Sequence, residues 1–137
     1  MTHLALNPAR ITAGTAAYVA ASFVVQALSH FVFAADHFAA VPFMRPEPIM
    51  AMGVGTMLVQ GALLTGVFGR FGRAETLARD AIAYALAMGA FLGAYIAIVE
   101  PAKYAVPSIG SWIMVEGLAA LVQFILFGLG LRLVFRP

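Results

Sequence analysis

The chain contains no cysteine in its 137 residues. This absence excludes disulfide bonds, thiolate metal sites, iron–sulfur ligation and dithiol redox chemistry. Histidine is scarce as well, with three residues, and their positions do not supply a ligand from each of two facing helices for a haem. We therefore predict no cofactor and no metal site. One alternative stays open, a single metal ion held by His37, Asp36 and Glu47.

Charged residues are also few. Asp, Glu, Lys and Arg make up 10% of the chain and hydrophobic residues 63%, which lies outside the usual composition of soluble domains. Long stretches carry no ionisable side chain, so we expect the apolar excess to face lipid. The net charge of +2 comes mainly from arginines at the ends of apolar stretches. Membrane topology explains that placement better than nucleic-acid binding does.

Four apolar segments are long enough to cross a membrane, which takes about 20 helical residues. Short polar or proline-containing breaks separate them, among them Arg45-Pro46-Glu47-Pro48. We place the helices at about 11–34, 48–68, 81–99 and 108–134. The sequence therefore predicts an all-α polytopic membrane protein, an antiparallel bundle of four transmembrane helices that forms a single domain over residues 1–137.

Basic residues are unevenly divided between the two ends of the predicted bundle. One end has only Arg45 and Lys103. The other end collects Arg10, Arg70, Arg73, Arg79, Arg132 and Arg136. Because loops rich in Arg and Lys stay in the cytoplasm, we expect both termini to be cytoplasmic. The first segment is too long for the apolar core of a cleavable signal peptide, so we expect it to remain as a helix.

Polar residues inside the predicted spans recur on shared helical faces. On the first span, Tyr18, Ser22, Gln26 and His30 follow one another every four residues. Polar side chains in hydrocarbon usually face the interior of a bundle, so these faces should meet. The predicted ligand-binding residues are Glu116, His30, Gln26, Gln60, Tyr95 and Gln123.

Glu116 is the most informative single residue, because it lies about eight residues, or roughly 12 Å, inside the outer end of the fourth span. A carboxylate at that depth must be neutral, paired with a donor or open to water. His30 has a similar depth in the first span, and we expect the two to meet between neighbouring helices. Two interpretations stay open: a pair that fixes helix register, and a ligand site at the outer face with Glu100 and Lys103 as its lip.

Small residues occupy every fourth position of the third span, at Ala81, Ala85, Gly89, Gly93 and Ala97. Such a stripe lets two helix backbones approach closely, which favours association where lipid supplies no hydrophobic driving force. We interpret it as a helix-packing seam. Its partner is either a neighbouring span of the same chain or a helix from a second copy or a larger complex.

Several short segments of the last two-thirds of the chain resemble a known group of proteins. They are EPAKY at 100–104, SWIMVEG at 111–117, VQG at 59–61 and VQF at 122–124. Together they resemble small uncharacterised four-helix bacterial inner-membrane proteins. The resemblance implies a conventional four-helix bundle in a bacterial inner membrane, and it brings no activity, substrate or catalytic residue.

These observations favour a non-catalytic subunit or assembly partner of a larger membrane complex, since the loops are short and catalytic groups are sparse. The alternative is a binding or transport protein for a small apolar or amphipathic ligand, such as a lipid, quinone or isoprenoid, in an outer-half pocket around Glu116 and His30. A membrane enzyme that uses this pair as acid and base comes third. The expected partners are the lipid bilayer and either a larger complex, a second copy or a small apolar ligand, with no nucleic acid.

Overall fold

The computed structural model describes residues 4–136, and this part of the chain contains four helices that are long and apolar enough to cross a membrane. They are Pro8–Phe33, Met50–Phe71, Leu77–Lys103 and Ile109–Phe135. Such helices satisfy their own backbone polar groups, as a span in lipid requires. The chain is therefore a multi-pass membrane protein, and the predicted all-α fold with four transmembrane helices is confirmed.

The helices differ from the predicted spans mainly at their ends. In chain order they are α1 (Pro8–Leu28), η1 (Ser29–Phe33), α2 (Ala35–Ala39), α3 (Met50–Phe71), α4 (Leu77–Ala94), η2 (Tyr95–Val99), α5 (Glu100–Lys103) and α6 (Ile109–Phe135). Helix α1 begins earlier than expected because Asn7 Oδ1 caps it, accepting from the Arg10 amide at 2.9 Å. The third span does not stop at Pro101, because that proline lies in the first turn of α5, where a missing N–H is tolerated.

Two segments of π-helix, η1 and η2, widen the first and third spans near the same end of the bundle. In η1 the amide of Ala34 donates to the carbonyl of Ser29 at 2.9 Å, a hydrogen bond over five residues. Wide turns of this kind are rare and often occur at functional sites. No feature of the sequence predicted them.

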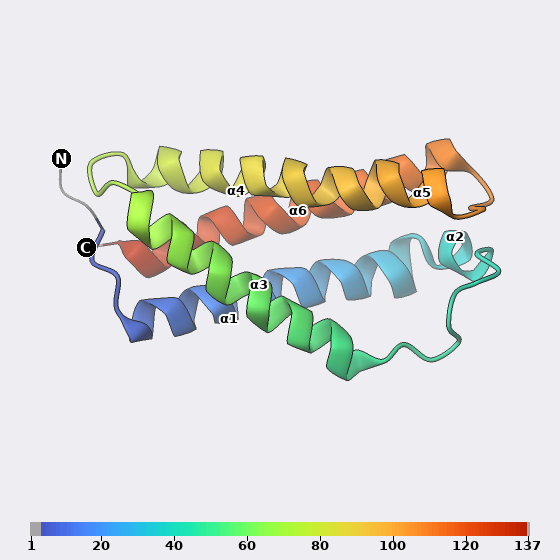
Figure 1. Ribbon diagram of the computed structural model, residues 1–137, viewed down its shortest axis with the longest axis horizontal. Coiled ribbons are helices and arrows are strands. Elements are labelled where there is room, and N and C mark those ends of the chain that lie inside the picture. The colour runs from blue at the N-terminus through green and yellow to red at the C-terminus, as the bar shows by residue number, and fades with distance from the viewer. Residues whose placement is uncertain (1–3, 137) are drawn as a thin grey trace.

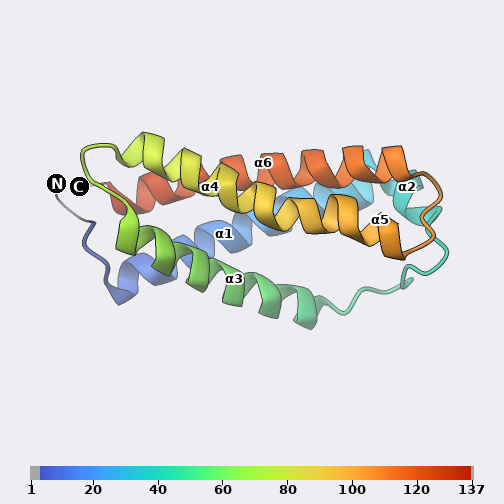
Figure 2. The same ribbon diagram turned by 45° about the horizontal axis from the view of Figure 1, so that its top comes forward.

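The spans run antiparallel, so the termini and the α3–α4 connection share one end, and α2 and α5 lie at the other (Figure 1). Figure 2 shows α1 beside α3 and α4 beside α6, and α1 also packs on α6. The backbones of α3 and α4 stay apart within the described residues. Their link is at the end near the termini, where Tyr84 Oη donates to the carbonyl of Leu64 at 2.9 Å. The helices therefore pack in the order α3–α1–α6–α4, and α3 and α4 meet through side chains at the end near the termini.

The small-residue seam packs against α6. Ala81 and Ala85 are fully buried, and a Cβ added at Gly89 would lie 2.8 Å from Cβ and Cγ of Phe124. A Cβ at Gly93 would lie 2.9 Å from the Cβ of Ala120. The seam thus brings the backbones of α4 and α6 together. Of the two predicted partners, the seam meets a neighbouring span of the same chain.

Close approach at glycine also joins the other packed pairs. Gly14 and Gly61 on α1 and α3 face Thr65 and Thr15 of the opposite helix, and an added Cβ at either glycine would crowd the threonine. Gly130 of α6 sits against Ala17 of α1. Every well-packed pair of spans in residues 4–136 therefore contains a glycine contact.

The apolar core lies in the half of the bundle that contains the termini. Its side chains include edge-to-face aromatic pairs, such as Tyr18 and Phe127 at 5.0 Å between ring centroids. The core residues are Leu4, Tyr18, Phe68, Leu77, Ala81, Ala85, Phe124, Phe127, Leu131 and Phe135. Aromatic rings therefore fill the interior of this half.

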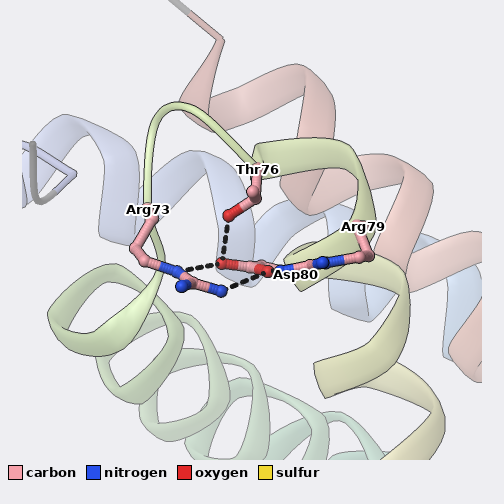
Figure 3. Close-up of polar contacts among 4 residues, drawn as sticks. All are labelled: Arg73, Thr76, Arg79 and Asp80. Carbon is pink, nitrogen blue, oxygen red and sulfur yellow. Dashed lines mark hydrogen bonds and ion pairs between the residues drawn. The ribbon is translucent and has the colours of Figure 1, made fainter. Parts of the chain in front are cut away.

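The short connection between α3 and α4 is held by one carboxylate, that of Asp80 (Figure 3). Arg73 donates to it through Nε at 2.9 Å and Nη2 at 3.1 Å, and Thr76 Oγ1 donates at 2.8 Å. Arg79 adds an ion pair at 3.5 Å. The hydrogen bonds to Asp80 raise the pKa of the Arg73 guanidinium above its usual value. A two-point Arg–carboxylate pair fixes geometry as well as charge, so this turn is tied to the start of α4.

We predict that Gly89→Leu destabilises the bundle by about 1–3 kcal/mol, because overpacking at the seam would push α4 away from α6. The measurement is the free energy of unfolding in micelles. Gly66→Leu is the matched control, since an added Cβ there meets nothing within 4 Å. Equal free energies of unfolding of the two variants would contradict the close packing of α4 on α6 at Gly89.

Candidate functional site

A cavity of about 490 Å³ opens between the four spans in the half of the bundle opposite the termini. Its volume lies within the usual range of small-molecule sites. The lining residues are Tyr18, Ser22, Gln26, Met52, Gly53, Thr56, Met57, Gln60, Leu92, Gly93, Tyr95, Ile96, Glu116, Ala120, Gln123 and Phe124. Five of the six residues predicted as ligand-binding lie in this set; the sixth, His30, does not.

Four polar side chains of this wall form a continuous hydrogen-bonded chain across three helices. Gln26 Nε2 donates to Gln123 Oε1 at 3.3 Å, and Gln123 Nε2 donates to Tyr18 Oη at 3.3 Å. Tyr18 Oη in turn donates to Gln60 Oε1 at 2.8 Å. Buried polar groups need such partners, and linked bonds polarise one another. The chain joins α1, α6 and α3, so it fixes their register.

Glu116 lies on the same wall but outside this chain of hydrogen bonds. Its side chain is buried, with 7% of the residue exposed, and it lines the cavity from α6. Within residues 4–136, no hydrogen bond or ion pair reaches its carboxyl group. Burying a carboxyl group without a protein partner is costly, so Glu116 is an unsatisfied polar group in the cavity wall.

The cavity opens sideways between α3 and η2. Met52 is 68% exposed and Tyr95 54% exposed, and Thr56 between them is also exposed. Towards its Met50 end, α3 diverges from α4 and α5 (Figures 1 and 2). This opening faces the lipid rather than the end of the bundle, because it lies along the length of two spans.

The two residues predicted as an outer lip are near the opening but do not line the cavity. Lys103 Nζ donates to Tyr95 Oη at 3.2 Å and lies 5.2 Å from the centre of that ring. Glu100 on α5 is half-buried and interacts electrostatically with Glu116. Lys103 therefore holds a cavity residue in place, and Glu100 adds negative charge near the site.

The structure separates His30 from Glu116, which we expected to meet. The His30 ring stacks on Phe38, with 3.7 Å between centroids, and its Nδ1 lies 3.0 Å from the carbonyl of Gln26. No hydrogen bond, ion pair or ring contact joins the two residues in the described part of the chain. His30 lines a second groove of about 300 Å³, which shares Gln26, Gly53 and Met57 with the cavity. The expected pair is absent because His30 lies in η1, where regular helical periodicity ends.

A cluster of aromatic residues and histidine closes the end of the bundle beyond the cavity. Trp112 is 4% exposed, and its Nε1 donates to the carbonyl of Ile96 in η2 at 3.0 Å. His37 Nδ1 lies 3.0 Å from Ser111 Oγ and packs on Trp112. Trp112 is therefore buried and braces η2 beside the cavity.

The comparisons with known proteins add no family or function. No family model, no curated protein and no solved structure matches the chain. Within residues 4–136 there is also no group of three His, Asp or Glu side chains that could hold a metal ion. The candidate site therefore rests on the geometry of the residues that line the cavity.

The predicted set of ligand-binding residues omitted several residues of the site. Tyr18 is the centre of the polar chain, and its place in the stripe with Gln26 was the signal that could have identified it. Met57 and Phe124 also line the cavity. Their sequence patterns are those of ordinary lipid-facing or core residues, so no signal in the sequence distinguishes them.

We predict that Tyr18→Phe costs about 1–3 kcal/mol of stability, because it removes a partner from both Gln60 and Gln123 in a buried wall. Thermal unfolding in nanodiscs measures the loss. Tyr104→Phe is the control, since that tyrosine is 52% exposed. If the two substitutions have the same effect, the polar chain does not stabilise the bundle.

Proposed function

We propose that this protein binds or transports a small amphipathic molecule, with the polar end of that molecule at Glu116. The observation that carries the proposal is the buried Glu116 carboxyl group, which lines the cavity without a partner from the protein. The apolar remainder of the wall and the sideways opening suit a ligand that partitions into lipid.

An enzyme with Glu116 and His30 as acid and base is not supported by this geometry. A general acid and a general base must both reach the reacting atoms. His30 stacks on Phe38 and lines another groove, so the pair does not face one substrate position. Binding, which needs only the one cavity, fits the residues better.

The binding function predicts that filling the cavity abolishes it. Gly53 lines the cavity and an added Cβ there meets nothing within 4 Å, so Gly53→Trp should occupy the space without a clash. Gly55 has equally open surroundings but does not line the cavity, and Gly55→Trp is the matched control. The probes are farnesol, decylubiquinone, lysophosphatidylcholine and decyltrimethylammonium.

We expect at least one of these probes to raise the melting temperature of the wild type and of Gly55→Trp, and not that of Gly53→Trp. The measurement is thermal unfolding in nanodiscs with and without probe. Absence of any shift in the wild type, or an undiminished shift in Gly53→Trp, would overturn the proposal.

We also propose that the membrane is a bacterial inner membrane and that the termini lie in the cytoplasm. The end of the bundle that contains the termini carries six arginines, whereas the opposite end has Arg45 and Lys103. Arg73 and Arg79 belong to the short turn that Asp80 holds in place. The cavity then lies in the outer half of the membrane.

The lack of cysteine makes this orientation easy to measure. We predict that Ala105→Cys reacts with a membrane-impermeant maleimide in intact cells, because residue 105 is exposed between α5 and α6. Ala74→Cys, exposed in the α3–α4 connection, should react only after the cells are permeabilised. The reverse pattern would show that the cavity faces the cytoplasmic half.

A non-catalytic subunit or assembly partner of a larger complex is the second candidate. It is favoured by a groove of about 390 Å³ on α4, η2 and α6, which is lined by small residues including Ala90, Ala94 and Gly117. Small residues allow a helix to dock closely. Gentle extraction followed by native mass spectrometry distinguishes the two candidates, since a protein that always runs alone contradicts the second.

A further inference from the structure

The charges around the cavity restrict the chemistry of its ligand. Glu116 is the one acidic residue among the lining residues, and the lining contains no Lys, Arg or His. Lys103 of α5 is engaged with Tyr95 of η2. Glu100, also on α5, adds a second negative charge near Glu116. The site is therefore negative whenever its carboxyl groups are ionised.

Three donors of the wall are occupied with one another, whereas the buried Ser22 hydroxyl has no hydrogen-bond partner within residues 4–136. The side-chain amides of Gln26 and Gln123 and the hydroxyl of Tyr18 all donate within the hydrogen-bonded chain. None of these bonds is directed at Glu116. No basic side chain of the lining neutralises the Glu116 carboxylate, so it would repel an anionic ligand. Placing like charges together at such a site is strongly disfavoured.

The rest of the lining suits a weakly hydrated organic cation. Phe124 adds an aromatic ring to the lining, and aromatic rings attract ammonium groups. Met52 and Met57 add polarisable sulfur, which adapts to an irregular alkyl group. These residues place apolar and aromatic surface around a single carboxyl group.

From this arrangement we infer that the ligand is a cationic amphiphile, an amine or quaternary ammonium whose head pairs with Glu116 and whose apolar part leaves between α3 and η2 toward lipid. The inference rests on the proposed binding function and adds to it the charge of the ligand. The exposed positions of Met52 and Thr56 mark the path of the apolar part.

The test uses three probes with one alkyl chain and different heads, namely decyltrimethylammonium, decanol and decanoate. Saturable binding is measured in phosphatidylcholine nanodiscs, with protein-free nanodiscs subtracted. We expect the cation to bind the wild type about tenfold more tightly than decanol, and Glu116→Gln to remove that preference. Glu47→Gln, an exposed carboxylate in the connection before α3, should leave it unchanged.

The pH dependence gives a second readout, because the charge of decyltrimethylammonium does not titrate. Its binding should weaken on acidification as Glu116 takes up a proton, and the dependence should be flat in Glu116→Gln. The other titratable groups near the site are Tyr18, His30, Tyr95, Glu100 and Lys103. If binding of decyltrimethylammonium still depends on pH in Glu116→Gln, one of these groups supplies the titrating charge. That result would overturn the pairing with Glu116.

The outcomes separate this inference from the proposed function. If decanol or decanoate binds as tightly as the cation, and Gly53→Trp abolishes that binding, the cavity is a ligand site but its ligand is not a cation. Saturable binding of none of the three probes would overturn the inference and count against the proposed function as well. Glu116→Gln is close in size and shape to the wild type, so its folding is checked by an unchanged melting temperature without probe.

Discussion

Close approach of helix backbones is the constraint on which this bundle depends. Lipid is as apolar as the side chains it touches, so helices associate through van der Waals fit and polar contacts rather than through a hydrophobic driving force. The glycines of α1, α3, α4 and α6 supply that fit at each packed pair of spans, as at Gly89 against Phe124. Helices α3 and α4 have no such contact among residues 4–136, and the cavity opens there. The site is thus the place where close packing stops.

The half of the bundle near the termini stabilises the fold, and the opposite half contains the proposed ligand site. The half near the termini contains the aromatic core, the Tyr84 link and the turn held by Asp80. The opposite half contains the hydrogen-bonded chain from Gln26 to Gln60, both π-helices and the unpartnered Glu116. Because the same four helices run through both halves, packing in the first half holds them together and allows a cavity in the second. The polar chain then keeps the wall of that space in register.

Much of this architecture follows from the sequence. Length and hydropathy predicted the four spans, and the cost of polar groups in lipid predicted that Gln26, Gln60 and Gln123 would share the interior. The small residues at every fourth position from Ala81 to Ala97 predicted a helix-packing seam. They did not predict which helix packs against it. The meeting of His30 and Glu116 was predicted and is absent, because the π-turn η1 disturbs the regular spacing on which the alignment relied. The separation of α3 from α4 depends on three-dimensional packing and has no signature in either segment alone.

The sideways opening between Met52 and Tyr95 has a consequence for how the site is filled. In the proposed function the ligand enters from the surrounding leaflet, where amphiphiles are far more concentrated than in water. Occupancy is then governed by the ratio of ligand to lipid, so it stays the same when the aqueous volume changes. Encounters occur by diffusion in two dimensions, and the leaflet acts as the reservoir.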